Sequence, residues 1–187
     1  DEFYSFHPSN NNCDGSVRKI LVFFGGTDPT NETKKAINAF KQLSSHDTEL
    51  DIVIGNTNTH KNEIEPFAKN MLSAAFTASE SYCRINVKAD LAIGAGGTAA
   101  WERCFLGLPA IVITVAENQE LIAQTLDQLG AIQYLGPKES VKESDIASAI
   151  NEMINNPSSL IQMSKKARML LEGNMDKRQN LLFEILK

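Results

Sequence analysis

The amino-acid sequence predicts an α/β protein: a Rossmann-like, doubly wound parallel sheet of about six strands with helices on both faces, followed by a helical C-terminal tail. Two patterns support this prediction. Short apolar runs alternate regularly with segments of helical periodicity, as in parallel strands joined by crossover helices. Several of the apolar runs end in unusual loops, at the strand ends where such sheets bind ligands.

The predicted strands are short, apolar and closed by turn residues. They cover residues 18–24, 50–54, 74–77, 91–93, 110–115 and 131–135. The segments between them place apolar residues at helical spacing. The predicted helices run from about residue 30, near 60–71, after residue 79 or 81, from about 98 to 107, over 121–129, and over 144–154, 158–171 and 176–186. Gly107, with Pro109 just beyond it, is expected to end the fourth helix.

Length and composition indicate a globular protein. The chain has 187 residues, of which 42% are hydrophobic and 22% charged. Residues 1–17 form a polar lead that we expect to be a linker or domain boundary, and residues 18–187 are expected to form one ligand-binding domain. The first residue is Asp1 rather than Met, so we expect the chain to be an excised piece of a longer protein.

Charge and cysteine usage argue against several classes. A net charge of −5, with no dense basic block, argues against a general nucleic-acid surface. Cys13, Cys83 and Cys104 are odd in number and lack C-x-x-C spacing, which argues against a disulfide framework or zinc site and favours a cytoplasmic protein. No signal peptide is recognisable, no apolar run approaches the roughly 20 residues of a membrane span, and no residue cluster predicts a metal.

The segment from residue 89 to 102 carries the strongest functional indication. Its apolar strand is followed at once by glycines, which we expect to adopt positive φ and to let a ligand approach the backbone. The helix that follows offers free N–H groups and a positive dipole end, which favour an anion such as a phosphate. Glu102 lies one turn into that helix, where it would accept hydrogen bonds from a sugar diol. The alternative is a tight strand-to-helix turn with a solvated Glu102.

Three loops are expected to converge at the carboxyl ends of the strands: residues 25–30, 94–98 and 116–119. In doubly wound sheets ligands bind at this edge, where the strand order reverses. Because cations are scarce in the three loops, helix dipoles and backbone N–H groups are expected to meet the phosphate charge.

These loops carry a family resemblance. The strings FGGTDPTN at residues 24–31, ADLAIGAGGTAAWE at 89–102, and GLPA at 107–110 leading to AENQ at 116–119 occur in family order and spacing. The chain resembles the C-terminal half of GT-B-fold nucleotide-sugar proteins. It is most similar to the UDP-sugar hydrolases of pseudaminic acid biosynthesis and the spore-coat polysaccharide proteins, and more distantly to the glycosyltransferase MurG.

The resemblance implies a UDP-binding half with no cofactor and with UDP or a UDP-sugar as its ligand. It implies roles for the following residues: Gly96, Gly97 and Thr98 at the diphosphate; Gly25, Gly26 and Thr27 facing the phosphates across the cleft; Glu102 at the ribose hydroxyls; Asn118 and Gln119 at the phosphates and donor sugar; and the segment that ends at Tyr82 at the uracil. In such hydrolases a histidine of the N-terminal half activates water. The catalytic residue is therefore unknown here and is expected in an N-terminal domain of the same protein, while this chain alone is expected to be inactive.

The function expected from this resemblance is hydrolytic release of UDP from a UDP-linked diacetamido-trideoxy sugar in surface polysaccharide or pseudaminic acid biosynthesis. A MurG-like transferase that uses the same donor half is the alternative. Residues 94–99 also fit the G-x-G-x-x-A dinucleotide fingerprint, with Glu117 further on, so a dinucleotide-binding or non-catalytic binding domain is the alternative from another class. His7, His46 and His60 are expected to face solvent, near amino-terminal strand ends or at a helix start.

Overall fold

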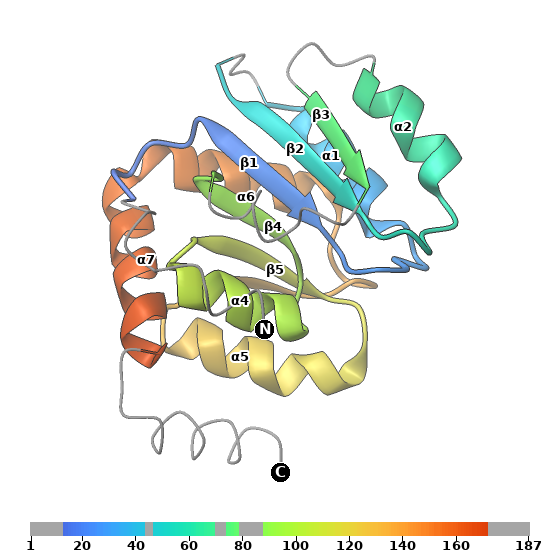
Figure 1. Ribbon diagram of the computed structural model, residues 1–187. Coiled ribbons are helices and arrows are strands. Elements are labelled where there is room, and N and C mark those ends of the chain that lie inside the picture. Colours follow the sequence, from blue (N-terminus) through green and yellow to red (C-terminus); the bar gives the residue numbers. More distant parts are fainter. Residues whose placement is uncertain (1–12, 44–46, 70–73, 79–87, 172–187) are drawn as a thin grey trace.

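The computed structural model describes residues 13–43, 47–69, 74–78 and 88–171. Six parallel strands form one sheet in the order β3-β2-β1-β4-β5-β6, as Figure 1 shows. Their bounds are β1 Lys19–Phe23, β2 Glu49–Ile54, β3 Ala74–Ala78, β4 Leu91–Ala95, β5 Ala110–Thr114 and β6 Gln133–Pro137. The predicted doubly wound parallel sheet is confirmed. Strands β1 to β5 lie within a few residues of their predicted bounds, whereas β6 lies two residues further along the chain than predicted.

The last strand begins two residues later than predicted. Ala131 and Ile132 are buried, but they close the preceding helix rather than extend the sheet: the Ala131 N–H donates to the Leu126 carbonyl at 2.9 Å. Apolar character alone therefore placed the start of β6 too early, because burial beneath a helix end and burial in a strand look alike in sequence.

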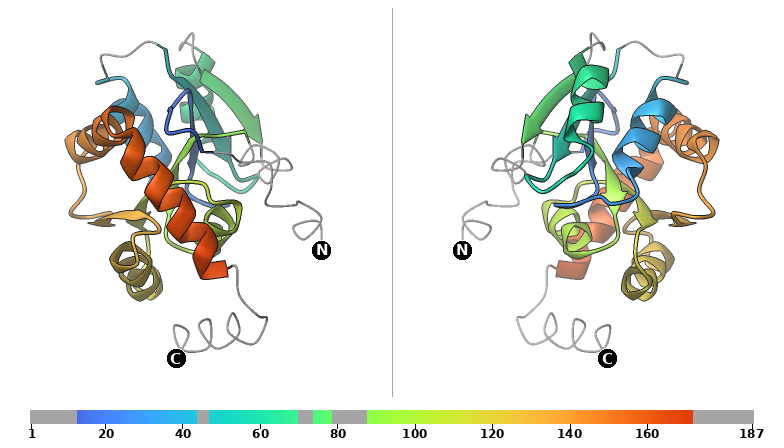
Figure 2. Two further views of the ribbon diagram at one scale, coloured as in Figure 1. Left: turned by 90° about the vertical axis from the view of Figure 1, so that its left-hand side faces the viewer. Right: turned by 90° about the vertical axis from the view of Figure 1, so that its right-hand side faces the viewer.

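Helices cover both faces of the sheet (Figure 2). On one face lie α1 (Glu32–Phe40) and α6 (Glu143–Asn155), and on the other lie α4 (Thr98–Leu106) and α5 (Glu120–Gln128). Side chains alternate between the two layers, since Ile20 and Val22 of β1 join the first core cluster and Leu21 joins the second. Both central strands β4 and β5 are buried along their full length, as expected where helices cover both faces.

Two further helices complete the described fold. α2 (Lys61–Lys69) packs against the edge strand β3, and α7 (Pro157–Leu171) crosses the amino-terminal edge of the sheet (Figure 1). The hydroxyl of Ser164 on α7 donates to the carbonyl of Gly107, the residue that ends α4 with a φ of 64°. Gly107 thus ends its helix as predicted. The helices expected after residue 79 or 81 and over 176–186 lie outside the described residues.

The strand order sets the position of the functional edge. β1 lies between β2 and β4, and the crossover from β1 to β2 runs in the opposite direction to the crossover from β4 to β5. The carboxyl ends of β1 and β4 meet at this switch point, with Phe23 opposite Gly94 in the register. A crevice at this position is the usual ligand site of doubly wound sheets. In the part of the chain that the structure describes, no helix is long and apolar enough to cross a membrane.

Candidate functional site

The three predicted loops do come together at one edge. The loop after β1, the turn after β4 and the short 3-10 helix η4 (Glu117–Gln119) after β5 all follow the carboxyl ends of neighbouring strands. Gly97 of the second loop lies beside Gln119 of the third, because a Cβ placed on Gly97 would be 3.4 Å from the Gln119 amide nitrogen. The predicted convergence of these loops is therefore present in the fold.

The first loop is open on one side and held on the other. Gly25 has a φ of 95°, and a Cβ built on it would have no atom within 4 Å, so its backbone faces open space. The loop after β2 fixes Gly26: the Thr57 hydroxyl donates to the Gly26 carbonyl at 3.0 Å, and Gly55 packs directly on the Gly26 backbone. Sequence reasoning did not assign Gly55 or Thr57 a role in supporting the first loop. The glycine directly after strand β2, Gly55, was the available indication of a close backbone contact there.

Asp28 of the first loop caps α1. Its buried carboxylate accepts the backbone N–H groups of Glu32 and Thr33 at 2.9 and 3.0 Å. An exogenous anion at the start of α1 would compete with this carboxylate. The loop therefore contributes its own open backbone to a site, while the amino end of its helix is already satisfied.

The start of α4 differs, because no side chain caps it. Its N-cap residue is Gly97, with no side-chain cap hydrogen bond, and Thr98 is exposed beside it. The first N–H groups of this nine-residue helix are thus available to an anion together with its positive dipole end. Of α1 and α4, the helices that follow the two glycine loops, α4 is the one whose amino end fits the predicted phosphate contact.

The glycines of this turn do not adopt the expected positive φ. Gly94, Gly96 and Gly97 all have φ outside the left-handed region, and Gly97 has φ −81°. At two of them the neighbours leave no room for a side chain: a Cβ on Gly96 would lie 3.1 Å from the Thr114 side chain, and one on Gly94 would collide with the Phe23 carbonyl oxygen and with Arg103. Close packing therefore explains Gly94 and Gly96, while close approach of a ligand to the backbone at Gly97 stays a prediction.

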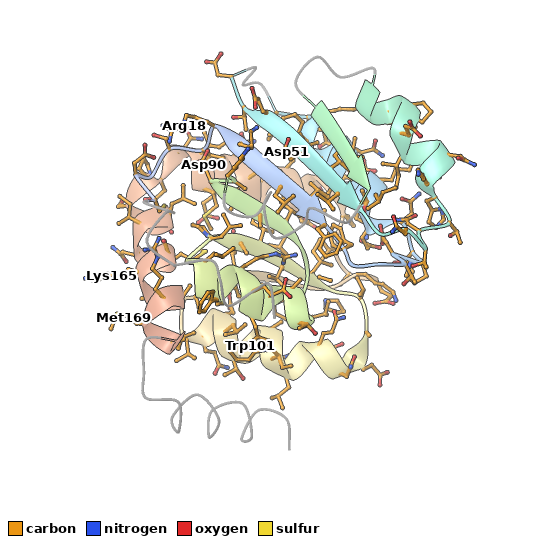
Figure 3. All side chains as sticks on the ribbon, viewed as in Figure 1. Arg18, Asp51, Asp90, Trp101, Lys165 and Met169 are labelled. Carbon is orange, nitrogen blue, oxygen red and sulfur yellow. The ribbon has the colours of Figure 1, made fainter. Side chains whose placement is uncertain are left out.

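Glu102 is half-buried on α4, and burial raises the pKa of its carboxyl group while the neighbouring Arg103 lowers it. Within the described residues its carboxylate has no hydrogen-bond partner. A partly desolvated and unpaired carboxylate one turn into the helix suits the hydroxyl contacts that its position predicts. Trp101 packs against the core cluster between α4, α5 and the sheet (Figure 3).

Arg103 is the residue that sequence reasoning missed. Its side chain is 0% exposed, and it donates from Nη2 to the Phe23 carbonyl at 3.1 Å and from Nη1 to the Ala95 carbonyl at 3.3 Å. It thus joins the carboxyl ends of β1 and β4 directly behind the two glycine loops. The three loops themselves contain no Lys or Arg, but the guanidinium of Arg103 is buried at the strand ends from which the first two loops begin. Gly94, whose missing side chain leaves the necessary room, was the available indication.

The remaining predicted residues are less constrained. Asn118 is exposed on η4. Gln119 is half-buried, and its side-chain oxygen Oε1 accepts a hydrogen bond from the backbone N–H of Val115 at 3.0 Å. Beside them, the ammonium group of Lys138 donates to the Val115 carbonyl at 2.9 Å. Tyr82, expected at the uracil, lies outside the described residues.

His60 lies closer to the site than expected. It begins the turn before α2, as predicted for a helix start, but this places it at the carboxyl edge, where its Nε2 is 3.3 Å from the Pro29 carbonyl. Its Nδ1 is 3.8 Å from the Glu63 carboxylate. Because both ring nitrogens face protein oxygens, His60 is poorly placed to accept a proton from a ligand over the loops. In residues 13–43, 47–69, 74–78 and 88–171 no group of His, Cys, Asp or Glu is arranged to hold a metal ion.

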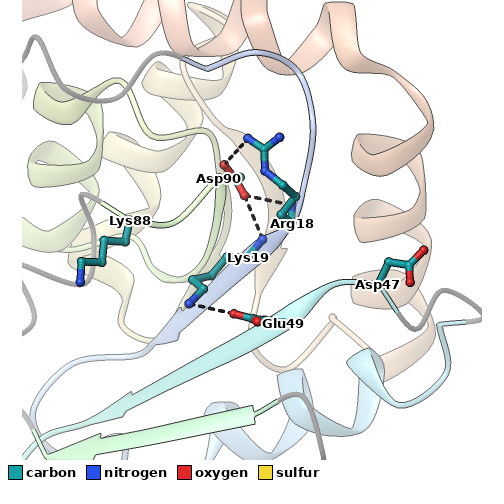
Figure 4. Close-up of a pocket in the computed structure, with 6 residues that line it drawn as sticks. All are labelled: Arg18, Lys19, Asp47, Glu49, Lys88 and Asp90. Carbon is teal, nitrogen blue, oxygen red and sulfur yellow. Dashed lines mark hydrogen bonds and ion pairs between the residues drawn. The ribbon is translucent and has the colours of Figure 1, made fainter.

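A hollow of about 440 Å³ lies at the opposite, amino-terminal edge (Figure 4). Lys19 pairs there with Glu49 at 2.9 Å, and Asp90 accepts the backbone N–H groups of Arg18 and Lys19, each at 2.9 Å. Four of the six residues that line this hollow thus contact one another.

Comparison with known proteins agrees with the fold. The model of the glycosyltransferase family 28 C-terminal domain matches residues 20–179. The chain is 26% identical over 158 residues to the spore coat polysaccharide biosynthesis protein SpsG of Bacillus subtilis, covering 83% of this chain and 47% of SpsG. It is 34% identical over 120 residues to the NDP-glycosyltransferase YjiC of the same organism, covering 63% of this chain and 28% of YjiC.

Solved structures show the same fold. MurG of Acinetobacter baumannii superposes with a TM-score of 0.69 at 17% identity, over 98% of this chain and 52% of MurG. HepE of Anabaena, solved with UDP-glucose, superposes with a TM-score of 0.66 at 13% identity, over 89% of this chain and 49% of HepE. The chain thus spans about half the length of SpsG, MurG and HepE, and a smaller share of YjiC. It belongs to the glycosyltransferase family 28 C-terminal domain family and has the fold of the C-terminal half of a GT-B protein.

Proposed function

We propose that this chain binds the nucleotide-sugar donor of a glycosyltransferase, with a UDP-sugar as the donor, and that the three loops at the carboxyl edge form the donor site. The family match and the fold support a donor-binding half. HepE was solved with UDP-glucose, and the rhamnosyltransferase SpnG, which has the same fold, was solved with thymidine diphosphate. Both ligands carry a pyrimidine nucleoside diphosphate, which is the class of ligand proposed here.

One observation carries this proposal: the start of α4 has no side-chain cap hydrogen bond among the described residues, at the edge where the backbone of Gly25 faces open space, and Glu102 of the same helix has no described hydrogen-bond partner. In this arrangement the N–H groups at Gly97 and Thr98 meet the diphosphate, with Gly96 giving the turn its close packing. Glu102 accepts the ribose hydroxyls.

The other predicted residues complete the proposed site. Gly25, Gly26 and Thr27 face the phosphates from the first loop, while Asn118 and Gln119 reach the phosphates and the donor sugar from the third. Tyr82 is proposed at the uracil on the family resemblance alone. The dipole and N–H groups would stabilise the leaving diphosphate as the glycosidic bond breaks.

A transferase is favoured over the hydrolase expected from sequence. YjiC and SpnG, whose names state an activity, are both glycosyltransferases. This supports an acceptor hydroxyl rather than water as the nucleophile. The similarity to SpsG supports a role in surface polysaccharide synthesis. The second half of the enzyme, with the acceptor site and the catalytic base, is proposed to be an N-terminal domain of the same protein. A cytoplasmic location remains part of this proposal.

Calorimetry on the chain tests the ligand. We expect UDP to bind without added metal and NAD to bind weakly. Glu102→Gln should weaken UDP binding roughly 10- to 100-fold, the range for a hydrogen bond to a charged group. Glu152→Gln on α6, at a side chain whose described contact is with Gln133, is the matched control and should bind as the wild type does. Tight NAD binding without UDP binding would replace this proposal with the dinucleotide alternative.

The reaction is tested on the gene product that contains this chain. UDP release that requires an added sugar acceptor supports the transferase. UDP release at the same rate without an acceptor would restore the hydrolase.

A further inference from the structure

Arg103 is a buried cation for which the described residues provide no counter-ion. Its side chain is 0% exposed, and in the part of the chain that the structure describes it forms no ion pair with a carboxylate. Its Nε has no hydrogen-bond partner among the described residues. The adjacent Glu102 lies about 100° further round the helix and does not contact the guanidinium by a hydrogen bond. Burial of an unpaired charge destabilises a fold, so this position calls for an explanation.

The fold is built to admit this guanidinium. A Cβ on Gly94 would collide with Arg103 Nη2, so strand β4 lacks a side chain at the residue that lies opposite Phe23. A small apolar residue at position 103 would fill the same layer as Ala100 and Cys104 without burying a charge. Neither the packing of α4 nor the core therefore requires an arginine.

The two carbonyl groups that Arg103 contacts suggest what it does. Phe23 and Ala95 are the last residues of β1 and β4, and their carbonyl oxygens lie at the edge where the ligand site opens. Parallel strands present negative carbonyl ends at this edge, which repel an anion. Donation from Nη1 and Nη2 neutralises two of these ends, and the remaining positive charge lies directly behind both glycine loops.

We propose that Arg103 is a positioning residue that supplies the buried positive potential for the diphosphate and aligns the β1 and β4 loops around it. It acts through the field and through the Phe23 and Ala95 carbonyls, since its full burial keeps it from touching the ligand. The inference rests on the proposed function, because it requires a diphosphate at this edge. The arriving anion would supply a counter-charge to the guanidinium, which the described residues do not provide.

A charge effect and a purely structural staple predict different results. A field from Arg103 acts on the phosphates and leaves the uncharged nucleoside unaffected, whereas a displaced loop weakens both ligands. We therefore expect Arg103→Gln to reduce UDP affinity at least tenfold and to change uridine affinity less than twofold, measured by calorimetry and ligand-observed NMR. Arg103→Lys keeps the charge and should retain most of the preference for UDP over uridine. Lys142→Gln, a matched loss of one positive charge at the start of α6, should leave the ratio unchanged.

A wild-type measurement covers the case in which a variant does not fold. The Nε–H resonance of Arg103 should shift when UDP is added and stay in place when uridine is added. Two results would overturn the role of Arg103 while leaving the donor site intact. One is an unchanged ratio of UDP affinity to uridine affinity in folded Arg103→Gln; the other is an Arg103 resonance that does not shift when UDP is added. Failure of the wild-type chain to bind UDP at all would overturn the proposed function itself.

Discussion

Replacing Gly94 by alanine tests how tightly the two sides of the switch point are coupled. The added methyl group would collide with the Phe23 carbonyl oxygen on the neighbouring strand and with Arg103 Nη2. Phe23 is paired with Gly94 in the sheet register, so its oxygen moves away only if β1 and β4 separate. Arg103 is fully buried and has no solvent-filled space into which to retreat.

The expected cost follows from these contacts. Overpacking of a tight core typically costs about 1–3 kcal/mol. Displacement of the guanidinium also weakens hydrogen bonds to a charged donor, at about 1.5–3 kcal/mol for each. The sum for one lost bond is about 2.5–6 kcal/mol, a large part of the total stability of a typical domain. For a chain of this size, it would lower the thermal midpoint by roughly 5–24 °C.

Urea and thermal unfolding followed by circular dichroism measure this cost, with two glycines of the same site as controls. Gly97→Ala places its methyl 3.4 Å from the flexible Gln119 amide and should cost less than about 1 kcal/mol. Gly25→Ala meets no atom within 4 Å but strains a backbone at φ 95°, for about 1–3 kcal/mol. A Gly94→Ala protein as stable as Gly97→Ala would refute the close coupling of Gly94, Phe23 and Arg103.

Three further outcomes are expected. Gly97→Val should stay folded and lose UDP binding, because its branched side chain occupies the space before the N–H groups of α4; calorimetry showing normal affinity would remove this turn from the site. Because burial raises the pKa of Glu102, UDP affinity should fall as pH drops toward that pKa and the carboxylate takes up a proton; Glu102→Gln, titrated in parallel, should lack this component, and identical pH profiles would contradict the role of Glu102. Asp28→Ala removes two N-cap hydrogen bonds and should cost about 1–2 kcal/mol in urea unfolding, whereas Asp28→Asn, which tolerates the φ of 39°, should cost less; equal losses would argue against this cap.

The order of the elements was predictable because it depends on local patterns. The run at residues 18–24 and the strand around Ile93 are too short and too apolar for anything except buried strands, and both are followed at once by glycine. Gly107 ends α4 at a φ of 64°, as its position before Pro109 predicted. The start of β6 was placed wrongly, since Ile132 owes its burial to the end of α5.

The site was predictable in outline, since the loops that follow parallel strands share one edge. Its internal order was not. Gly94 and Gly96 were expected to provide positive φ, but they make room for side chains that arrive from Arg103 and Thr114. His60 was assigned to solvent, but it lies against Pro29 of the first loop.

Sequence alone thus determined the described helices, the strands apart from the start of β6, the three loops and the edge at which they meet, because hydrophobic period and turn chemistry act over a few neighbouring residues. The tertiary structure decided which groups those loops face. Arg103 and Phe23 are separated by 80 positions along the chain, and only the pairing of β1 with β4 brings the guanidinium to both strand ends. Contacts between distant residues depend on strand order and helix placement, which no local pattern encodes.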